Sequence, residues 1–191
     1  FLYTFAGSVL MLVAILALRL YTGTFDIEAI PAEMADASRV LQRWVFVAFF
    51  FAFAIKVPMF PFHTWLPDAH VEAPTAGSMV LAGVLLKMGA YGFLRFVLPM
   101  TPDAVDETRG LMIVLSLAAI IYGALVAMVQ PDLKKLVAYS SVSHMGYVLM
   151  GFATLNALGT GGAVLQMFSH GIMTALFFAL VGSIYDRTHV R

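Results

Sequence analysis

The feature that most limits how this chain can fold is the stretch from Gly110 to Val129, twenty consecutive residues without a charged side chain. A helix of about 20 apolar residues spans the hydrocarbon of a bilayer. Other mainly apolar segments of spanning length lie at residues 1–18, 44–67, 75–98, 133–155 and 162–184. This pattern predicts an all-α, polytopic membrane bundle of about six transmembrane helices, in a single domain covering residues 1–191.

The composition agrees with a membrane protein and excludes several function classes. The chain is 61% hydrophobic and only 12% charged, whereas globular proteins average about 25% charged residues. Its formal net charge of zero argues against a nucleic-acid partner. It has no cysteine, so no thiolate can hold an iron–sulfur cluster or zinc. The chain begins at Phe1 without a signal-peptide pattern, and we expect a piece of a longer polytopic protein.

The connections between the spans are short and polar. We expect an extramembrane loop at residues 20–43 holding a short helix, an acidic loop at 99–109, and a glycine-bearing turn at 156–162. Pro74 is placed to start the helix at 75–98.

The segment 44–67 is apolar as far as Lys56 and then contains three closely spaced prolines, at Pro58, Pro61 and Pro67. Proline lacks an N–H and clashes with the carbonyl four residues before it. We therefore expect freed or strained carbonyls at Ala54, Val57 and His63. A lysine beside loosened carbonyls in mid-membrane predicts an ion-handling helix broken at Pro58. The alternative is a kinked helix whose Lys56 extends to the headgroups.

Four ionisable side chains lie near the midpoints of four different predicted spans: Lys56, Lys87, His144 and His170. Offsets of up to three residues correspond to about 5 Å along a helix, so the four share a common depth. A charge at the bilayer centre costs about 2.5–3.5 kcal/mol or more. Four such groups predict a proton relay joined by internal water, in which histidine passes protons through its two ring nitrogens. The alternative for each histidine is a purely structural hydrogen bond.

Polar neighbours on the same helices fit such a relay. Ser140 and Ser141 precede His144 by four and three residues, and Gln166 and Thr174 flank His170 at four-residue spacing. These spacings place each group on the face of its histidine.

The remaining polar candidates are two histidines and two lysines. His63 and His70 flank a Trp-Leu-Pro-Asp sequence and either order the end of the broken helix or lie at a proton entry. No third ligand stands at metal-like spacing, so we expect no metal site. Lys134 and Lys135 are predicted to anchor a helix end at the membrane interface.

Two stretches resemble a known family. They are FPFHTWLPDAHVEAPTAGSMVLAGVLLKMGAYGFLRF at 60–96 and DLKKLVAYSSVSHMGYV at 132–148. Both are similar to the antiporter-like membrane subunits of respiratory complex I, above all to the M type, which corresponds to subunit 4 of the mitochondrial enzyme. The sequence HTWLPDAHVEAPTAGS is specific to that type, and the resemblance covers nearly the whole chain.

The resemblance implies a larger fold of two inverted repeats, each with a broken helix, of which this chain holds the end of the first and the start of the second. It implies proton translocation coupled to NADH oxidation and quinone reduction elsewhere in the complex. Lys56 matches the lysine of the first broken helix, Lys87 the lysine linking two half-channels, and His144 and His170 the relay histidines of the second. The Lys134/Lys135 end then faces the cytoplasm.

The same resemblance implies a multi-pass protein of the bacterial inner membrane. Its partners are other membrane subunits of complex I, the lipid bilayer, protons and internal water, without nucleic acid. No cofactor is expected in this chain, and flavin and iron–sulfur clusters are expected in partner subunits. The alternatives are a subunit of a multisubunit Na⁺/H⁺ antiporter and a non-conducting membrane scaffold.

Overall fold

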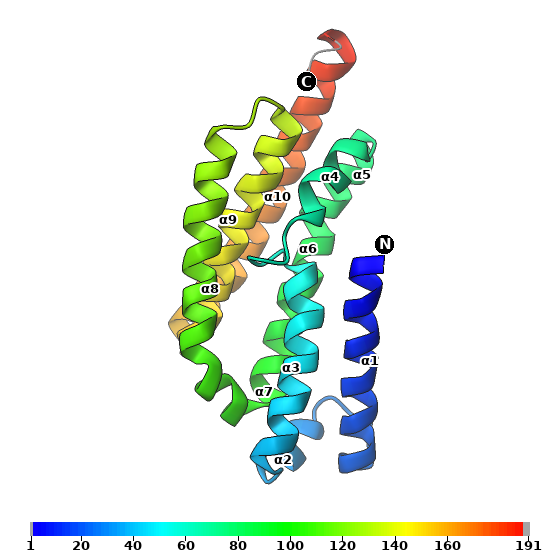
Figure 1. Cartoon of the computed structure of the whole chain (residues 1–191), viewed down its shortest axis with the longest axis vertical. Coiled ribbons are helices and arrows are strands. Elements are labelled where there is room, and N and C mark those ends of the chain that lie inside the picture. The colour runs from blue at the N-terminus through cyan, green and yellow to red at the C-terminus, as the bar shows by residue number, and fades with distance from the viewer. Residues whose placement is uncertain (1, 189–191) are drawn as a thin grey trace.

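The computed structural model describes residues 2–188 (Figure 1). Within that part of the chain all regular secondary structure is helical, which confirms the predicted all-α class. The separate helices are α1 (Leu2–Thr22), α2 (Ile30–Ala35), α3 (Arg39–Lys56), α4 (Trp65–Glu72), α8 (Pro102–Met128), α9 (Leu133–Ala153) and α10 (Ala157–Thr188).

Between α4 and α8 one uninterrupted helical rod runs from Thr75 to Met100. Its parts are α5 (Thr75–Val80), η1 (Leu81–Leu85), α6 (Leu86–Gly92), η2 (Phe93–Val97) and α7 (Leu98–Met100). The two η segments are π-helical, with wider turns than the α-helix.

Four helices of the described chain are long and apolar enough to cross a membrane by length and composition: Leu2–Thr22, Thr75–Met100, Pro102–Met128 and Ala157–Thr188. The predicted count of six is therefore not confirmed. The other two expected spans are α9, which carries Lys134, Lys135 and His144, and the broken segment formed by α3 and α4. α9 carries charged side chains, and the segment of α3 and α4 contains irregular backbone; both lie among the apolar helices.

The helices form two groups joined by the rod (Figure 1). α8, α9 and α10 lie side by side, and α1 packs on α3. From its start near α2, α3 rises to the middle of the molecule, where the chain leaves the helix and crosses toward α8 and α9. α4 then continues to the far end. The break therefore lies at mid-height inside the bundle.

α3 and the rod pack through aromatic rings and small residues. The Phe49 and Phe53 rings stack with centroids 5.7 Å apart, and Phe53 lies 6.0 Å from Phe93 of the rod. At Gly92 an added Cβ would meet the Phe53 ring, and at Gly89 it would lie 2.9 Å from the Lys56 Cβ. The absence of side chains at these glycines brings the rod against the end of α3, where Lys56 stands.

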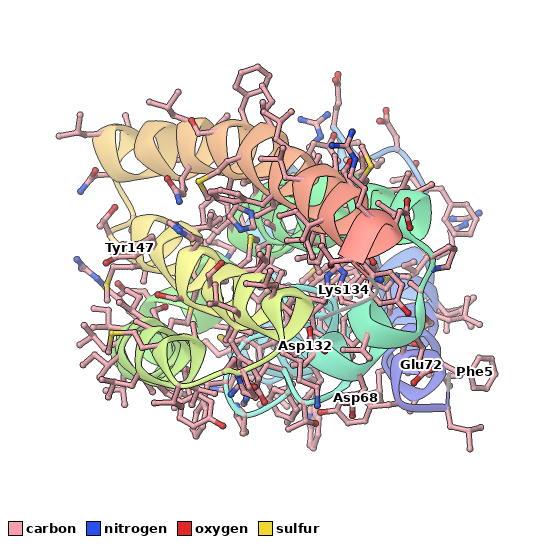
Figure 2. All side chains as sticks on the ribbon, turned by 90° about the horizontal axis from the view of Figure 1, so that it is seen from above. Phe5, Asp68, Glu72, Asp132, Lys134 and Tyr147 are labelled. Atoms are coloured by element: carbon pink, nitrogen blue, oxygen red, sulfur yellow. The ribbon has the colours of Figure 1, made fainter. Side chains whose placement is uncertain are left out.

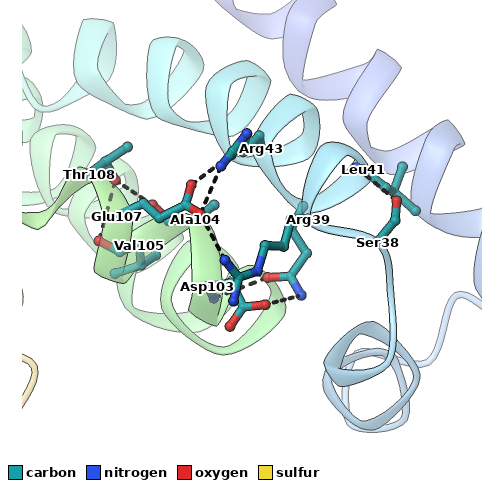
Figure 3. A network of polar contacts seen from close by, with 10 residues as sticks. Ser38, Arg39, Leu41, Arg43, Asp103, Ala104, Val105, Glu107 and Thr108 are labelled. Carbon is teal, nitrogen blue, oxygen red and sulfur yellow. Dashed lines mark hydrogen bonds and ion pairs between the residues drawn. The ribbon is translucent and has the colours of Figure 1, made fainter.

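The predicted acidic loop at 99–109 is wrong, because α8 begins at Pro102. Proline at the first position and Asp103 in the first turn are favourable there. Glu107 then projects from a helix, and its carboxylate accepts from Arg43 Nε at 2.7 Å and Nη2 at 2.9 Å (Figure 3). Buried Gln42 accepts from the Asp103 N–H at 3.1 Å. These residues tie α3 to the start of α8.

The predicted turn at 156–162 is also wrong, since α10 starts at Ala157. Asn156 caps it, with Oδ1 accepting from the Gly159 N–H at 2.8 Å. Gly159 serves packing rather than a turn, because an added Cβ there would collide with Thr154. The expected short helix in the 20–43 connection is present as α2.

Glycines also set the spacing of α8 and α9. An added Cβ at Gly123 would lie 2.7 Å from the Ser143 N, and one at Gly146 would lie 3.0 Å from the Ser116 carbonyl oxygen. Both clashes involve backbone atoms, which cannot move aside like a flexible side chain. Small residues at such positions let membrane helices approach closely.

We expect Gly123→Ala to separate α8 from α9 and to destabilise the protein by about 1–3 kcal/mol, the usual cost of overpacking. Gly110→Ala is the matched control on the same helix, because no atom lies within 4 Å of its added Cβ. Higher helix propensity makes that control neutral or stabilising by up to about 1 kcal/mol. Thermal unfolding in detergent measures both, and equal midpoints for the two variants would contradict the packing account.

Candidate functional site

Three of the four predicted relay residues meet in the core. Lys87 of α6 places Nζ 2.7 Å from Nδ1 of His170 on α10. The His170 ring lies beside that of His144 on α9, with centroids 5.2 Å apart. Gln166 Nε2 lies 3.0 Å from His144 Nδ1. Lysine, two imidazoles and an amide thus form a row across three helices, which we call the Lys87–His144 row.

The contact between Lys87 and His170 is suited to proton exchange. A charged lysine can only donate, so the ammonium donates to an unprotonated Nδ1. A neutral amine can instead accept from a protonated Nδ1. The two arrangements differ by the position of one proton along a single 2.7 Å contact. Interchange of these two arrangements requires no large movement of either side chain.

His170 is held firmly in this position. Its side chain is 1% exposed, and Thr174 Oγ1 donates to its backbone carbonyl at 2.6 Å. Thr174 therefore bonds to the backbone of His170. The other ring nitrogen, Nε2, is buried and has no hydrogen-bond partner within residues 2–188.

The break forms at the predicted place, but the carbonyls are satisfied in a different way. α3 ends at Lys56, and Pro58 has no N–H to offer the Ala54 carbonyl, which accepts from the Met59 N–H at 3.0 Å instead. The His63 carbonyl likewise accepts from Leu66 N–H at 3.0 Å. The carbonyls of Ala54 and His63 are therefore not free, although their donors stand five and three residues ahead instead of four.

The carbonyl that loses its helical donor is that of Ile55, directly before Lys56. Its usual donor, the Met59 N–H, is used by Ala54, and the Trp65 indole N–H takes its place at 2.8 Å. Trp65 was not among the predicted site residues. The signal for it is a tryptophan, an apolar side chain with one polar donor, a few residues after a proline break in an apolar segment.

Lys56 does not join the Lys87–His144 row. It is half-buried and lines a cavity of about 1150 Å³ that Lys87 also lines. The remaining lining is almost entirely apolar and comes from α1, α3, the rod and α10. Among the described residues no hydrogen bond joins the two lysines, so the cavity separates the break from the row.

The predicted supporting serines are placed elsewhere. Ser140 and Ser141 both donate to the Val137 carbonyl, at 2.8 and 3.0 Å. The structure therefore does not bring their hydroxyls to His144, and the polar neighbour of that ring is Gln166.

His63 and His70 are buried among aromatic rings. Their exposed fractions are 2% and 0%, and in the described part of the chain none of their ring nitrogens has a hydrogen-bond partner. The His63 ring lies 5.1 Å from Tyr122, and the His70 ring stacks on Phe178 at 4.3 Å. Both residues pack α4 and the break against α8, α9 and α10, and no group of metal-ligating side chains occurs within residues 2–188.

Lys134, predicted as an anchor at the membrane interface, lies inside this end of the bundle and not on its surface. Its side chain is 7% exposed, and Nζ donates to the Ala73 carbonyl at the end of α4, at 2.9 Å. Figure 2 shows it in the middle of this end of the molecule, with Asp68 and Glu72 toward the edge. Lys135 is the exposed member of the pair and lies 3.9 Å from Asp68.

A membrane helix bundle with a lysine beside a mid-membrane break and ionisable residues in its core has the features of an ion-handling membrane protein. Comparison with known families gives the group. The chain belongs to the NADH:quinone oxidoreductase/Mrp antiporter transmembrane family, whose model matches residues 1–191. The resemblance seen in the sequence is thereby confirmed.

Individual proteins similar to this chain are named as members of the same family. The chain is 53% identical to NADH-quinone oxidoreductase subunit M of Rhodobacter capsulatus, covering 100% of this chain and 40% of that protein. It is 51% identical to NADH-ubiquinone oxidoreductase chain 4 of Chondrus crispus, covering 100% and 38%. The chain thus spans about 40% of the length of such curated relatives.

Solved structures show the same fold. A chain of respiratory complex I from Thermus thermophilus with bound NADH matches 99% of this chain and 40% of its own length, at a TM-score of 0.91 and 37% identity. A chain of the Mrp complex from Dietzia matches 99% and 35%, at a TM-score of 0.84 and 24% identity. The second likeness shows the fold alone.

Trp65 supplies the prediction for this site. Trp65→Phe keeps an aromatic ring but leaves the Ile55 carbonyl unpaired, and we expect a loss of about 1–3 kcal/mol of stability. Trp44→Phe is the control, because Trp44 is 71% exposed and the chain has only two tryptophans. Thermal unfolding of the two variants in detergent checks this. A Trp65→Phe midpoint equal to that of Trp44→Phe would show that the indole bond is dispensable.

Proposed function

We propose that this chain is part of a proton-translocating, non-redox membrane subunit of an NADH–quinone oxidoreductase. The Lys87–His144 row carries the proposal. Its side chains are within hydrogen-bond or ring contact across α6, α10 and α9. Lys87 takes up and releases a proton at Nζ, His170 passes it between its ring nitrogens, and His144 continues the path toward Gln166.

Lys56 is the second proton-handling group in this proposal. It stands at the end of α3 beside the break, and the cavity that it shares with Lys87 lies between the two lysines. Water in that cavity would connect them, since their side chains do not touch. In a low-dielectric interior the charge on one lysine also acts on the other at a distance. A change of charge at Lys56 thereby alters the electrostatic potential at Lys87.

The partners follow from the relatives. Proteins about half identical to this chain are named as subunits of NADH–quinone or NADH–ubiquinone oxidoreductases. We infer that the full-length protein lies in a bacterial inner membrane, in contact with lipid and with other membrane subunits of such a complex. The flavin and iron–sulfur clusters then belong to partner subunits, and electron transfer there drives proton movement here.

A cation/proton antiporter subunit is the alternative function with the same machinery. The Mrp complex shares the fold with this chain, but the oxidoreductase relatives are much closer in sequence. A non-conducting scaffold is disfavoured, because the bond of Lys87 to the Ala82 carbonyl would suffice for the fold and leaves its contact with His170 without a use.

Lys87→Met tests the proposal. Methionine keeps much of the volume and removes a buried charge, so the subunit should assemble. Proton uptake by reconstituted vesicles should fall by about tenfold or more, the loss of an acid–base group, and NADH oxidation should fall with it if the two steps are tightly coupled. Lys87→Arg keeps a charge that does not deprotonate, and partial activity in that variant would mean that Lys87 acts as a fixed charge.

Arg95→Met is the matched control, since it removes an exposed charge from the same rod. It should leave proton uptake unchanged. Full proton uptake in an assembled Lys87→Met protein would reject the relay, and loss of the subunit from the membrane in Lys87→Met alone would favour the scaffold.

A further inference from the structure

The rod contains a π turn directly before Lys87. In η1 the Leu86 N–H bonds to the Leu81 carbonyl, five residues back, instead of the Ala82 carbonyl four residues back. Where the α-helix resumes after a π turn, one carbonyl is left without a backbone donor. Ala82 is fully buried, so water cannot serve its carbonyl from the surface.

Lys87 supplies the missing donor. Its Nζ lies 2.5 Å from the Ala82 carbonyl oxygen and 2.7 Å from His170 Nδ1. The ammonium is therefore held between a backbone oxygen released by the π turn and a ring nitrogen of the neighbouring helix. A hydrogen bond to a charged donor is stronger than one between neutral groups, so the charged lysine favours the π turn.

The second π turn has a different cause. η2 lies before Pro99, whose ring clashes with the carbonyl four residues back, and a wider turn relieves that clash. No proline follows η1 within the next ten residues. η1 instead contacts another helix, α10. An added Cβ at Gly171, next to His170, would lie 3.0 Å from the Gly83 carbonyl oxygen. η1 thus stands where the rod and α10 touch backbone to backbone.

The extra residue in η1 sets the direction of Lys87. Each residue turns an α-helix by about 100°. At an unchanged residue count, conversion of the π turn into α-helix therefore rotates everything after it relative to what comes before. With α5 fixed against α10, loss of the π turn would point Lys87 away from His170.

We propose that the π turn Leu81–Leu85 is a positioning element for Lys87. It releases the Ala82 carbonyl as an acceptor, aims Lys87 at His170, and is itself held open by the lysine that it positions. The structural part of this inference is independent of the proposed function, and only its effect on proton transfer rests on that function.

The structural part is tested by cryo-electron microscopy of the full complex carrying Lys87→Met or Lys87→Arg. In Lys87→Met the Ala82 carbonyl has lost its donor, so we expect the Leu86 N–H to bond to Ala82 and the extra residue to move out of Leu81–Leu85. Lys87→Arg retains a donor and should retain the π turn. A π turn that persists unchanged in Lys87→Met overturns the inference.

The functional part is tested by deleting Val84, which removes the extra residue. The bond from the Leu86 N–H to the Leu81 carbonyl then has the ordinary α-helical spacing, so Lys87 keeps its direction, while the Ala82 carbonyl regains a backbone donor and is lost as an acceptor for Lys87. Val84 is 57% exposed, and Val84→Ala is the matched control that keeps the residue count. Lys87 then lacks the carbonyl that stabilises its ammonium form. We therefore expect an altered pH dependence of proton uptake in the deletion variant only.

The outcomes separate the two ideas. Wild-type proton uptake and pH dependence in an assembled Val84 deletion overturn the positioning role, and a deletion variant that fails to assemble leaves the decision to the Lys87→Met structure. If the π turn moves in Lys87→Met while proton uptake stays normal, the proposed function fails and the structural coupling of Lys87 to the turn stands.

Discussion

The structure depends on one constraint: backbone carbonyls that leave the helical pattern inside an apolar bundle must find donors within the protein. Each unpaired group costs several kcal/mol in hydrocarbon. At three of the sites where the chain leaves the regular α-helix, a long side chain meets a carbonyl. Trp65 donates to Ile55, Lys87 to Ala82 and Lys134 to Ala73. These three side chains join the break, the rod and the end of α4 to the rest of the bundle.

This constraint accounts for the inward position of two lysines, buried Lys134 and half-buried Lys87. Lys87 and Lys134 each end on a backbone oxygen, so they serve the fold whatever else they do. Lys87 differs because it also reaches an imidazole, which gives it a partner able to exchange a proton. Lys56 has neither kind of contact among the described residues and faces the cavity. The three lysines therefore have separate environments, although each follows or precedes an interruption of a helix.

Much of the architecture could be predicted from the sequence. Twenty uncharged residues, three prolines after Lys56 and mid-span histidines are local signals, and the all-α class and the break followed from them. The starts of α8 and α10 were missed because Asp103, Glu107 and Gly159 suggested loops, while tertiary partners favour helix. The roles of Trp65, Lys134 and the π turn were beyond prediction, because each depends on a carbonyl that becomes available only when two distant segments meet.

The acceptor at Ala82 has a consequence for how such a site is found. Half of the coordination of Lys87 comes from a main-chain oxygen, and that oxygen is present whatever side chain occupies position 82. Alanine scanning leaves it in place, and a comparison of side-chain identities does not register it. The number of residues in the turn determines whether this oxygen is available, so changes of length report on the acceptor where substitutions at position 82 do not. Insertions and deletions, usually set aside in helices as merely disruptive, are here the informative class of variation.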